Sequence, residues 1–290
     1  MWKRWLLLIC GLPLLTCLGD ETDCRCNGSW LPEVPPLFRP FAADPRQVTS
    51  SVAWRFDDEP IAENVIPVSY ADQIAIYRWY NVGPRCGCVQ LGLEGALWAV
   101  FDPIEYSSPL INADYFIGGT LSYAEECWAI RLRAFHISSH IGDEFLLDNP
   151  NFDRRNPSAE YVDLFIDRTF WNFLRLYAGV GAIVHQDNSH KRGRFYAEYG
   201  AELRTWNFLN FCSSCNSLYG VPFAAVHFRH RDDFEGKLDF TLAAGYEIGK
   251  TCGLERRLRL FYEYHTGYAL EGQFDRHKTD FMSVRLTYGF

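Results

Sequence analysis

A histidine and a serine two positions apart, followed by a second histidine, are the residues in this chain best suited to chemistry: His136, Ser138 and His140. Imidazole and hydroxyl groups are a pair that nucleophilic catalysis uses, because the imidazole can activate the hydroxyl. Residues i, i+2 and i+4 share one face of a β-strand, so the three side chains are neighbours in an extended segment. The chemistry therefore depends on which strand carries them and where its faces point.

The segment Cys127 to Glu144 is predicted to be one membrane-spanning β-strand. Apolar residues at positions 130, 132 and 134 alternate with Arg131 and Arg133, which is the two-residue period of a strand with one apolar and one polar face. An arginine facing lipid near the bilayer midplane would cost roughly 2 to 4 kcal/mol, so we expect the even-numbered side chains to face lipid. The same parity places the two histidines and the serine on the lipid face.

Two alternatives to this interpretation remain open. A bulge between Arg133 and Phe135 would exchange the faces and turn the His-x-Ser set into the lumen. The histidines are alternatively interfacial residues near the lipid headgroups, with Ser138 a small residue without a role.

The N-terminus has the pattern of a secretory signal peptide over residues 1–19. Lys3 and Arg4 precede an apolar run, and Gly19 offers a cleavage site before Asp20. Residues 20–47, rich in Cys and Pro, are expected to form a periplasmic lead-in to a barrel over residues 48–290. No other apolar run of about 18 residues is present, so no membrane-spanning helix is expected. The net charge of −8 argues against nucleic-acid binding.

Alternating segments recur through the rest of the chain, beginning near residues 48, 70, 89, 115, 127, 161, 174, 197, 219, 238, 258 and 282. With 16% aromatic residues and 2 methionines, the pattern predicts an all-β protein, a transmembrane antiparallel β-barrel of about 12 strands. The connections after even-numbered strands are short, which is typical of periplasmic turns, so both termini are expected in the periplasm of a bacterial outer membrane. The lumen-facing positions mix both charge signs, which predicts a lumen plugged by ion pairs.

Eight cysteines follow the signal peptide: Cys24, Cys26, Cys86, Cys88, Cys127, Cys212, Cys215 and Cys252. All fall in the lead-in or at predicted periplasmic turns. In an exported protein they predict disulfides between turns, to the lead-in, or to other envelope proteins. Reduced cysteines packed as small hydrophobes are the alternative, and zinc at the Cys212-x-x-Cys215 pair is a weaker one.

The terminal strand ending in Phe290, the motif from His136 to Glu144, and the segments Phe38–Pro40 and Ala43–Arg46 together resemble a family of outer-membrane proteins of unknown function, known largely from chlamydia-like and planctomycete bacteria. The resemblance covers most of the mature chain. It implies a barrel in the outer membrane, assembled by the barrel-assembly machinery through the Phe290 strand. It supplies no established activity.

The lipid-facing His-x-Ser pair is also similar, more distantly, to that of outer-membrane phospholipase A and the outer-membrane lipid A deacylase. By that likeness Ser138 is the nucleophile that attacks an acyl ester of a membrane lipid, and His136 is its general base. For the third member we expect Glu160, which begins the next strand with lipid-facing parity, and Asn156 is the second choice. A strand tilted by about 45° climbs roughly 20 Å over the nine residues from Cys127 to His136, which places the site at the outer leaflet.

Two further segments and two other function classes have to be considered. Asp143 and Glu144 either orient His140 or bind calcium, which is the one cofactor that the sequence suggests. The stretch from His185 to His190 is interpreted as a solvated external loop. A non-enzymatic structural or interaction barrel of a disulfide-linked envelope, and a small-solute pore, are the alternatives to a lipid hydrolase.

Overall fold

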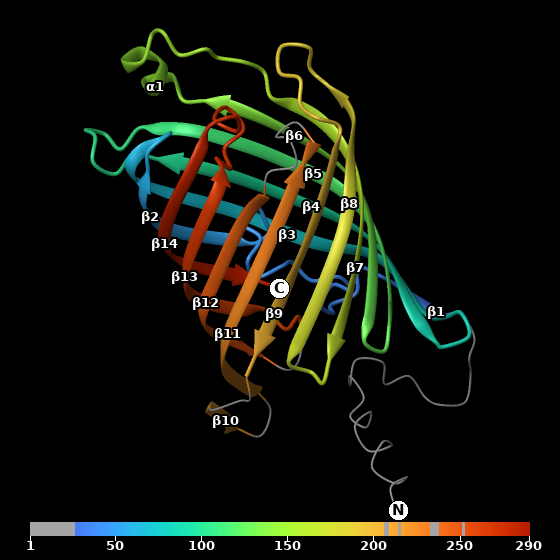
Figure 1. Ribbon diagram of the computed structural model, residues 1–290. Helices are drawn as coiled ribbons and strands as arrows, with labels where there is room; N and C mark the ends of the chain where they lie inside the picture. Colours follow the sequence, from blue (N-terminus) through green and yellow to red (C-terminus); the bar gives the residue numbers. More distant parts are fainter. Residues whose placement is uncertain (1–26, 206–208, 214–215, 233–237, 251–252) are drawn as a thin grey trace, which may run out of the picture.

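Twelve antiparallel strands form a closed β-barrel, which confirms the predicted fold class (Figure 1). The structure is a computed structural model that describes residues 27–205, 209–213, 216–232, 238–250 and 253–290, so the predicted signal peptide lies outside the described residues. The wall strands are β2 (Ser50–Asp58), β3 (Ala62–Val82), β4 (Gly87–Phe101), β5 (Leu110–Glu125), β6 (Trp128–Ile141), β7 (Ser158–Phe170), β8 (Leu174–Gln186), β9 (Phe195–Arg204), β11 (Asn216–Arg231), β12 (Leu238–Lys250), β13 (Arg257–Tyr268) and β14 (Lys278–Gly289). Pairing of β2 with both β3 and β14 closes the sheet.

Three short elements add to this wall. The strand β1 (Asn27–Trp30) pairs with β3, the strand β10 (Leu209–Ser213) pairs with β11, and the helix α1 (Asp143–Asp148) follows β6. No helix within the described ranges is long and apolar enough to cross a membrane.

The wall is apolar outside and polar inside, the reverse of a water-soluble barrel. On β14, Met282, Val284, Leu286 and Tyr288 are exposed, whereas the residues between them are buried. A large apolar outer surface is stable where hydrocarbon surrounds it. Four of the exposed tryptophans lie near one end of the barrel, at Trp30, Trp79, Trp128 and Trp171, as in the aromatic girdles of membrane barrels, whereas the exposed Trp54 lies within β2.

The two ends of the barrel differ in their connections (Figure 1). Residues 83–86, 126–127 and 171–173 make short turns at one end, which we call the short-turn end. Residues 102–109, 142–157, 187–194 and 269–277 form longer connections at the other, the long-loop end. The connection 205–215 is an exception, because it belongs to the short-turn end but is long and contains β10. The C-terminal strand finishes at the short-turn end.

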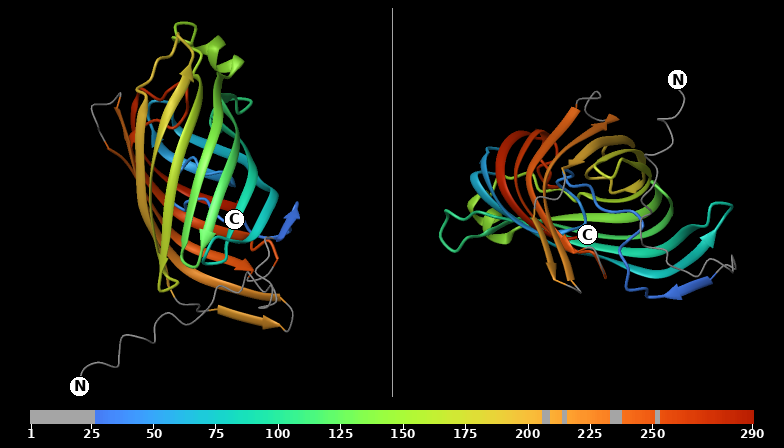
Figure 2. Two further views of the ribbon diagram at one scale, coloured as in Figure 1. Left: turned by 90° about the vertical axis from the view of Figure 1, so that its right-hand side faces the viewer. Right: turned by 90° about the horizontal axis from the view of Figure 1, so that it is seen from below.

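Residues 34–49, which we call the plug, lie inside the barrel (Figure 2). Phe38 and Phe41 are buried among inward side chains of the wall, including Phe165 and Tyr177. The ring of Phe41 stacks on that of Tyr177 with a centroid distance of 3.6 Å. From its sequence, this segment is expected below the barrel in the periplasm. Its Pro-rich backbone forms no strand, as expected, but its aromatic and small side chains fill the lumen.

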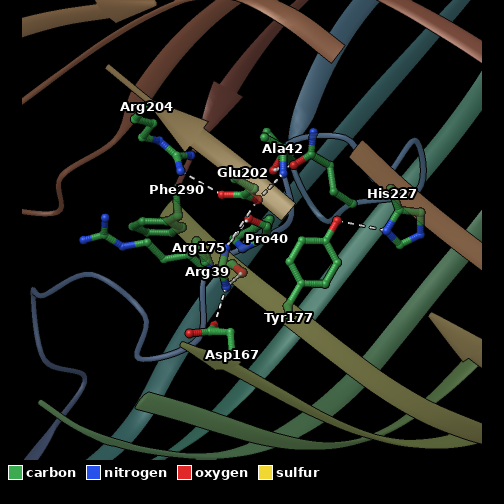
Figure 3. Close-up of polar contacts among 12 residues, drawn as sticks. Arg39, Pro40, Ala42, Asp167, Arg175, Tyr177, Glu202, Arg204, His227 and Phe290 are labelled. Atoms are coloured by element: carbon green, nitrogen blue, oxygen red, sulfur yellow. Dashed lines mark hydrogen bonds and ion pairs between the residues drawn. The ribbon is translucent and has the colours of Figure 1, made fainter. Parts of the chain in front are cut away.

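The backbone of the plug is held by buried charged groups of the wall (Figure 3). The Ala42 N–H donates to Glu202 (2.7 Å), and Arg175 donates to the carbonyl oxygens of Arg39 (2.9 Å) and Pro40 (3.3 Å). Arg204 donates to the second oxygen of Glu202 (2.8 Å). A buried backbone without secondary structure needs such partners for its polar groups.

The loop 269–277 folds inward and covers the long-loop end of the lumen. Arg55 donates to Glu271 (2.8 Å), Gln273 donates to the Ser139 carbonyl oxygen (3.1 Å), and Arg192 contacts Asp275 (2.6 Å). Below it, ion pairs fill the lumen as predicted, among them Arg133–Asp163, Arg259–Glu247 and Arg285–Glu263. The plug, the ion pairs and this loop together occupy the interior of the barrel.

Candidate functional site

The orientation of β6 confirms the predicted parity. Arg131 is buried, and Arg133 points inward to Asp163 (2.6 Å), whereas Ile130 and Leu132 are exposed. The pairings of β6 with β5 and β7 run without a register shift, so no bulge exchanges its faces. His136, Ser138 and His140 therefore lie on the outer wall, toward the long-loop end.

The inward residues of the motif have structural partners. Ser139 is buried, and its hydroxyl donates to Asn112 (3.1 Å). A side chain at Gly142 would place its Cβ 1.7 Å from the Leu110 carbonyl oxygen, so only glycine fits there. The outward side chains do not pack inside the barrel, and His140 makes an edge contact with the Tyr115 ring, at 5.5 Å between centroids. Barrel architecture therefore explains the inward half of the motif and leaves the outward half unexplained.

A carboxylate between two histidines forms the centre of the candidate site. Glu160 lies directly opposite His136 in the β6–β7 pairing. One oxygen of Glu160 is 3.1 Å from His136 Nδ1, and the other is 2.7 Å from His185 Nδ1. The prediction that Glu160 is the partner of His136 is thus consistent with the geometry. In serine hydrolases the acid holds Nδ1, and Nε2 exchanges the proton with the nucleophile.

A β-bulge brings His185 into this cluster. Glu160 pairs with His185 and Tyr161 with Ile183, so Val184 is the additional residue on β8. Without the bulge, His185 would share the inward face of Ile183. The interpretation of residues 185–190 as a solvated loop is wrong at both histidines, because His185 lies on β8 beside Glu160 and His190 is buried against Asp275 (3.0 Å).

Ser138 lies two residues beyond His136 on the same face, about 6.6 Å along the strand. No hydrogen bond engages its hydroxyl within the described part of the chain, so the group is available to an incoming substrate. A shallow groove of about 370 Å³ runs across the wall beside His136 and Glu160. Its other outward lining is apolar: Leu93, Ile117, Gly119, Ala134, Val162 and Val184. This lining suits a hydrocarbon chain.

Residues 20–290 match the family described as Protein of unknown function (DUF1207). The chain belongs to this family. No curated protein matches it. Among solved structures, LpxR from Salmonella typhimurium is similar at 14% identity and a TM-score of 0.38, over 83% of this chain and 100% of that chain. The beta domain of the Bordetella autotransporter Brka is similar at 11% identity and a TM-score of 0.42, over 83% of this chain and 97% of that one.

Other predicted site residues of the DUF1207 chain lie apart from the Glu160 cluster. Asn156, the second choice for the third member, donates instead to Asp187 (3.1 Å) in the neighbouring loop. Asp143 and Glu144 occupy the first turn of α1, where Glu144 accepts a hydrogen bond from Ser107 (3.1 Å) and not from His140. In the described ranges, no three His, Cys, Asp or Glu side chains converge as metal ligands, so the calcium prediction gains no geometric support.

The predicted disulfides of the DUF1207 chain are likewise not supported. The structure describes the side chains of Cys86, Cys88 and Cys127, and no disulfide joins these three to one another. Cys86 and Cys127 lie in turns of the short-turn end, as expected, whereas Cys88 is buried near the start of β4. The side chains of Cys24, Cys26, Cys212, Cys215 and Cys252 lie outside the described residues.

Proposed function

We propose that this DUF1207 protein is an outer-membrane hydrolase that cleaves acyl esters of lipids in the outer leaflet. The observation that carries the proposal is the hydrogen bond between His136 Nδ1 and Glu160 on the outer wall, beside Ser138. A base with its acid already in place, next to a free hydroxyl, is the arrangement that activates a serine nucleophile.

The location follows from the wall. Its apolar outer face and the tryptophans of the short-turn end support a membrane setting, with the short-turn end and both termini in the periplasm. In this setting the signal peptide would export the chain, and the Phe290 strand would engage the barrel-assembly machinery. Eight residues separate Trp128 in the aromatic girdle from His136, a climb of about 19 Å for a strand tilted by about 45°. The site then sits at the level of outer-leaflet acyl esters.

The free-energy cost of placing His136, Glu160 and His185 on a lipid-facing wall supports a functional role for them. Polar side chains on a lipid-facing wall are unfavourable, and those that persist within membrane spans mark functional sites by default. Glu160 and His136 are each only partly shielded, with 44% and 37% of their side-chain surfaces exposed. The two imidazoles offset part of the cost of the carboxylate. The side chains of His136, His185 and Glu160 lie on the outer wall and do not take part in the packing of the lumen.

The proposed reaction follows the geometry. Ser138 Oγ attacks the ester carbonyl carbon while His136 Nε2 takes its proton, and Glu160 stabilises the imidazolium at Nδ1. The imidazolium then donates this proton to the departing alcohol, which leaves an acyl group on Ser138. Water, deprotonated by the same imidazole, attacks the acyl carbon, and the imidazolium returns the proton to Ser138 Oγ as the acyl C–O bond breaks and the fatty acid leaves. The apolar groove beside the pair would hold the acyl chain during both steps.

The occupied lumen argues against the small-solute pore, because the plug packs inside the barrel and the loop 269–277 covers its long-loop end. The protein should therefore give no ion conductance in planar bilayers. A structural or interaction barrel would also give no ion conductance, so a chemical test has to distinguish it from the hydrolase.

A fluorophosphonate probe makes that separation in detergent-solubilised, folded protein. The wild type should be labelled, Ser138→Ala should not, and Ser158→Ala should be labelled as the wild type is. Ser158 is a matched control because it lies opposite Ser138 on the same outer wall. Heat-modified gel migration verifies that each variant is folded. A folded wild type that stays unlabelled contradicts the hydrolase.

A further inference from the structure

Two loops of the long-loop end bring cationic side chains together. The Arg276 guanidinium, in the loop 269–277, donates to the Lys191 carbonyl oxygen (2.6 Å) in the loop 187–194. The side chains of both residues, and that of Arg194, are exposed. This contact places the Arg276 guanidinium beside the backbone of Lys191, three residues before Arg194 in the same loop.

The carboxylates of the same two loops have hydrogen-bond or ion-pair partners of their own. Asp187 accepts hydrogen bonds from Ser189 (2.6 Å) and Asn156 (3.1 Å). Glu271 and Asp275 are buried and pair with Arg55 (2.8 Å) and Arg192 (2.6 Å). At the rim of the barrel, these two loops therefore present three exposed cations, beside the half-buried carboxylate of Asp187 and the exposed carboxylate of Asp232, which accepts a hydrogen bond from the Phe195 N–H (3.1 Å).

These cations lie directly beyond the proposed catalytic groups. The Asp187 N–H donates to the carbonyl oxygen of Ser158 (3.0 Å), the residue opposite Ser138. At the other end of the loop, the Arg194 carbonyl oxygen accepts from the Ile183 N–H (2.8 Å), next to Val184 in the groove wall. The loop that carries Lys191 and Arg194 thus starts and finishes beside the site, on its solvent side.

We infer that Lys191, Arg194 and Arg276 bind the phosphate of an anionic lipid headgroup while the acyl chains of that lipid lie against the wall. The phosphate of such a headgroup is attracted to exposed ammonium and guanidinium groups, and its acyl esters extend from it toward the hydrocarbon region, where His136 and Ser138 lie. The inference rests on the proposed function for the identity of the lipid as a substrate. Binding itself requires only the rim and the wall.

The test is native mass spectrometry of the full chain in neutral detergent, with phosphatidylglycerol and phosphatidylcholine of identical acyl chains as probes. The wild type should bind the anionic lipid more tightly than the zwitterionic one. The double variant Lys191→Gln, Arg276→Gln should lose about 25-fold in affinity for phosphatidylglycerol, about fivefold for each cation, and keep its affinity for phosphatidylcholine. Glutamine retains a donor for the Lys191 carbonyl oxygen, which protects the loop contact.

The control is Lys250→Gln, Arg256→Gln, which removes the same charge at the short-turn end and should bind as the wild type does. Equal binding of the two lipids, or equal loss in the control, overturns the inference. Full displacement of phosphatidylglycerol by low-millimolar inorganic phosphate also overturns it, because the rim would then be a site for free phosphate. The two proposals can fail separately, because this test measures binding and not catalysis. If the protein binds phosphatidylglycerol at the rim but is not labelled by the fluorophosphonate, the hydrolase is refuted and the headgroup site is retained.

Discussion

The plug should be released when Glu202 is replaced by alanine. Glu202 is buried and touches the plug directly, because it accepts a hydrogen bond from the Ala42 N–H (2.7 Å). It also lies between two buried guanidinium groups, Arg204 at 2.8 Å and Arg175 at 3.5 Å. The substitution removes the acceptor of a plug N–H and the negative charge that the two arginines share.

The size of the effect follows from these contacts. A buried N–H that loses its acceptor costs about 1 to 3 kcal/mol. Breaking a buried ion pair by removing one partner costs about 3 to 5 kcal/mol, and the two losses overlap here because one carboxylate makes both contacts. Arg175 keeps Asp167 (2.5 Å), so we take about 3 kcal/mol, the lower end, as the expected loss. At 1.4 kcal/mol per factor of ten, the population with a released plug rises about 10²-fold.

Limited trypsin digestion measures that population. The Arg46–Gln47 bond lies in the plug, where Arg46 pairs with Asp114 inside the barrel, so cleavage requires release of the plug. Cleavage there should accelerate about 10²-fold in Glu202→Ala and less in Glu202→Gln, which keeps an acceptor for the plug. The exposed bond after Arg154 is the internal control and should be cut at one rate in all three proteins. Acceleration of less than threefold at Arg46 in Glu202→Ala would refute this account of how the plug is held.

Three further predictions concern the site and the loops. Replacing Glu160 by Gln should slow fluorophosphonate labelling about 10²-fold, since the partly exposed carboxylate no longer stabilises the imidazolium 3.1 Å away. In the loop 269–277, burial alone would raise the pKa of Asp275, but Arg192 and a histidine hydrogen bond outweigh it and hold the pKa below 3.8. The stabilisation this carboxylate gives the closed loop is therefore present above pH 3.8 and lost as the pH falls through the lower, folded-state value, which pulsed hydrogen exchange of the loop detects. Gly142→Ala should lower the urea midpoint of unfolding, because its Cβ would overlap a carbonyl oxygen of β5.

The wall was predictable because membrane and lumen impose opposite requirements on alternate residues. On β6, Arg131 and Arg133 against Ile130 and Leu132 indicate both the strand and its parity. Glu160 was predictable for the same reason, since a residue of lipid-facing parity at the start of the next strand must lie near its partner. The short strands β1 and β10 escaped prediction because four or five residues carry little periodicity.

The plug and His185 were not predictable from periodicity. The plug has no regular structure, and nothing in its composition distinguishes a Pro-rich segment under a barrel from one inside it. The small and aromatic side chains of Phe38 and Phe41–Ala43 pack against inward side chains of the wall. His185 was hidden by the bulge at Val184, which changes parity within one residue of the end of β8. Bulges often re-aim a side chain, but this one is visible only in the pairing of the strands and not in the sequence.

The filled interior has a consequence for the outer wall. Three residues before His136, Arg133 is paired with Asp163, which is opposite it on β7 and three residues after Glu160. The same two strands are thus clamped on the inner face by an ion pair and carry the His136–Glu160 hydrogen bond on the outer face. A catalytic pair must be held within a fraction of an ångström of its working geometry by elements that do not move. A barrel with an open, water-filled lumen would leave these strands less constrained, so the filled lumen and the candidate site are parts of one arrangement, in which an ion pair on the inner face holds the two strands that carry His136 and Glu160.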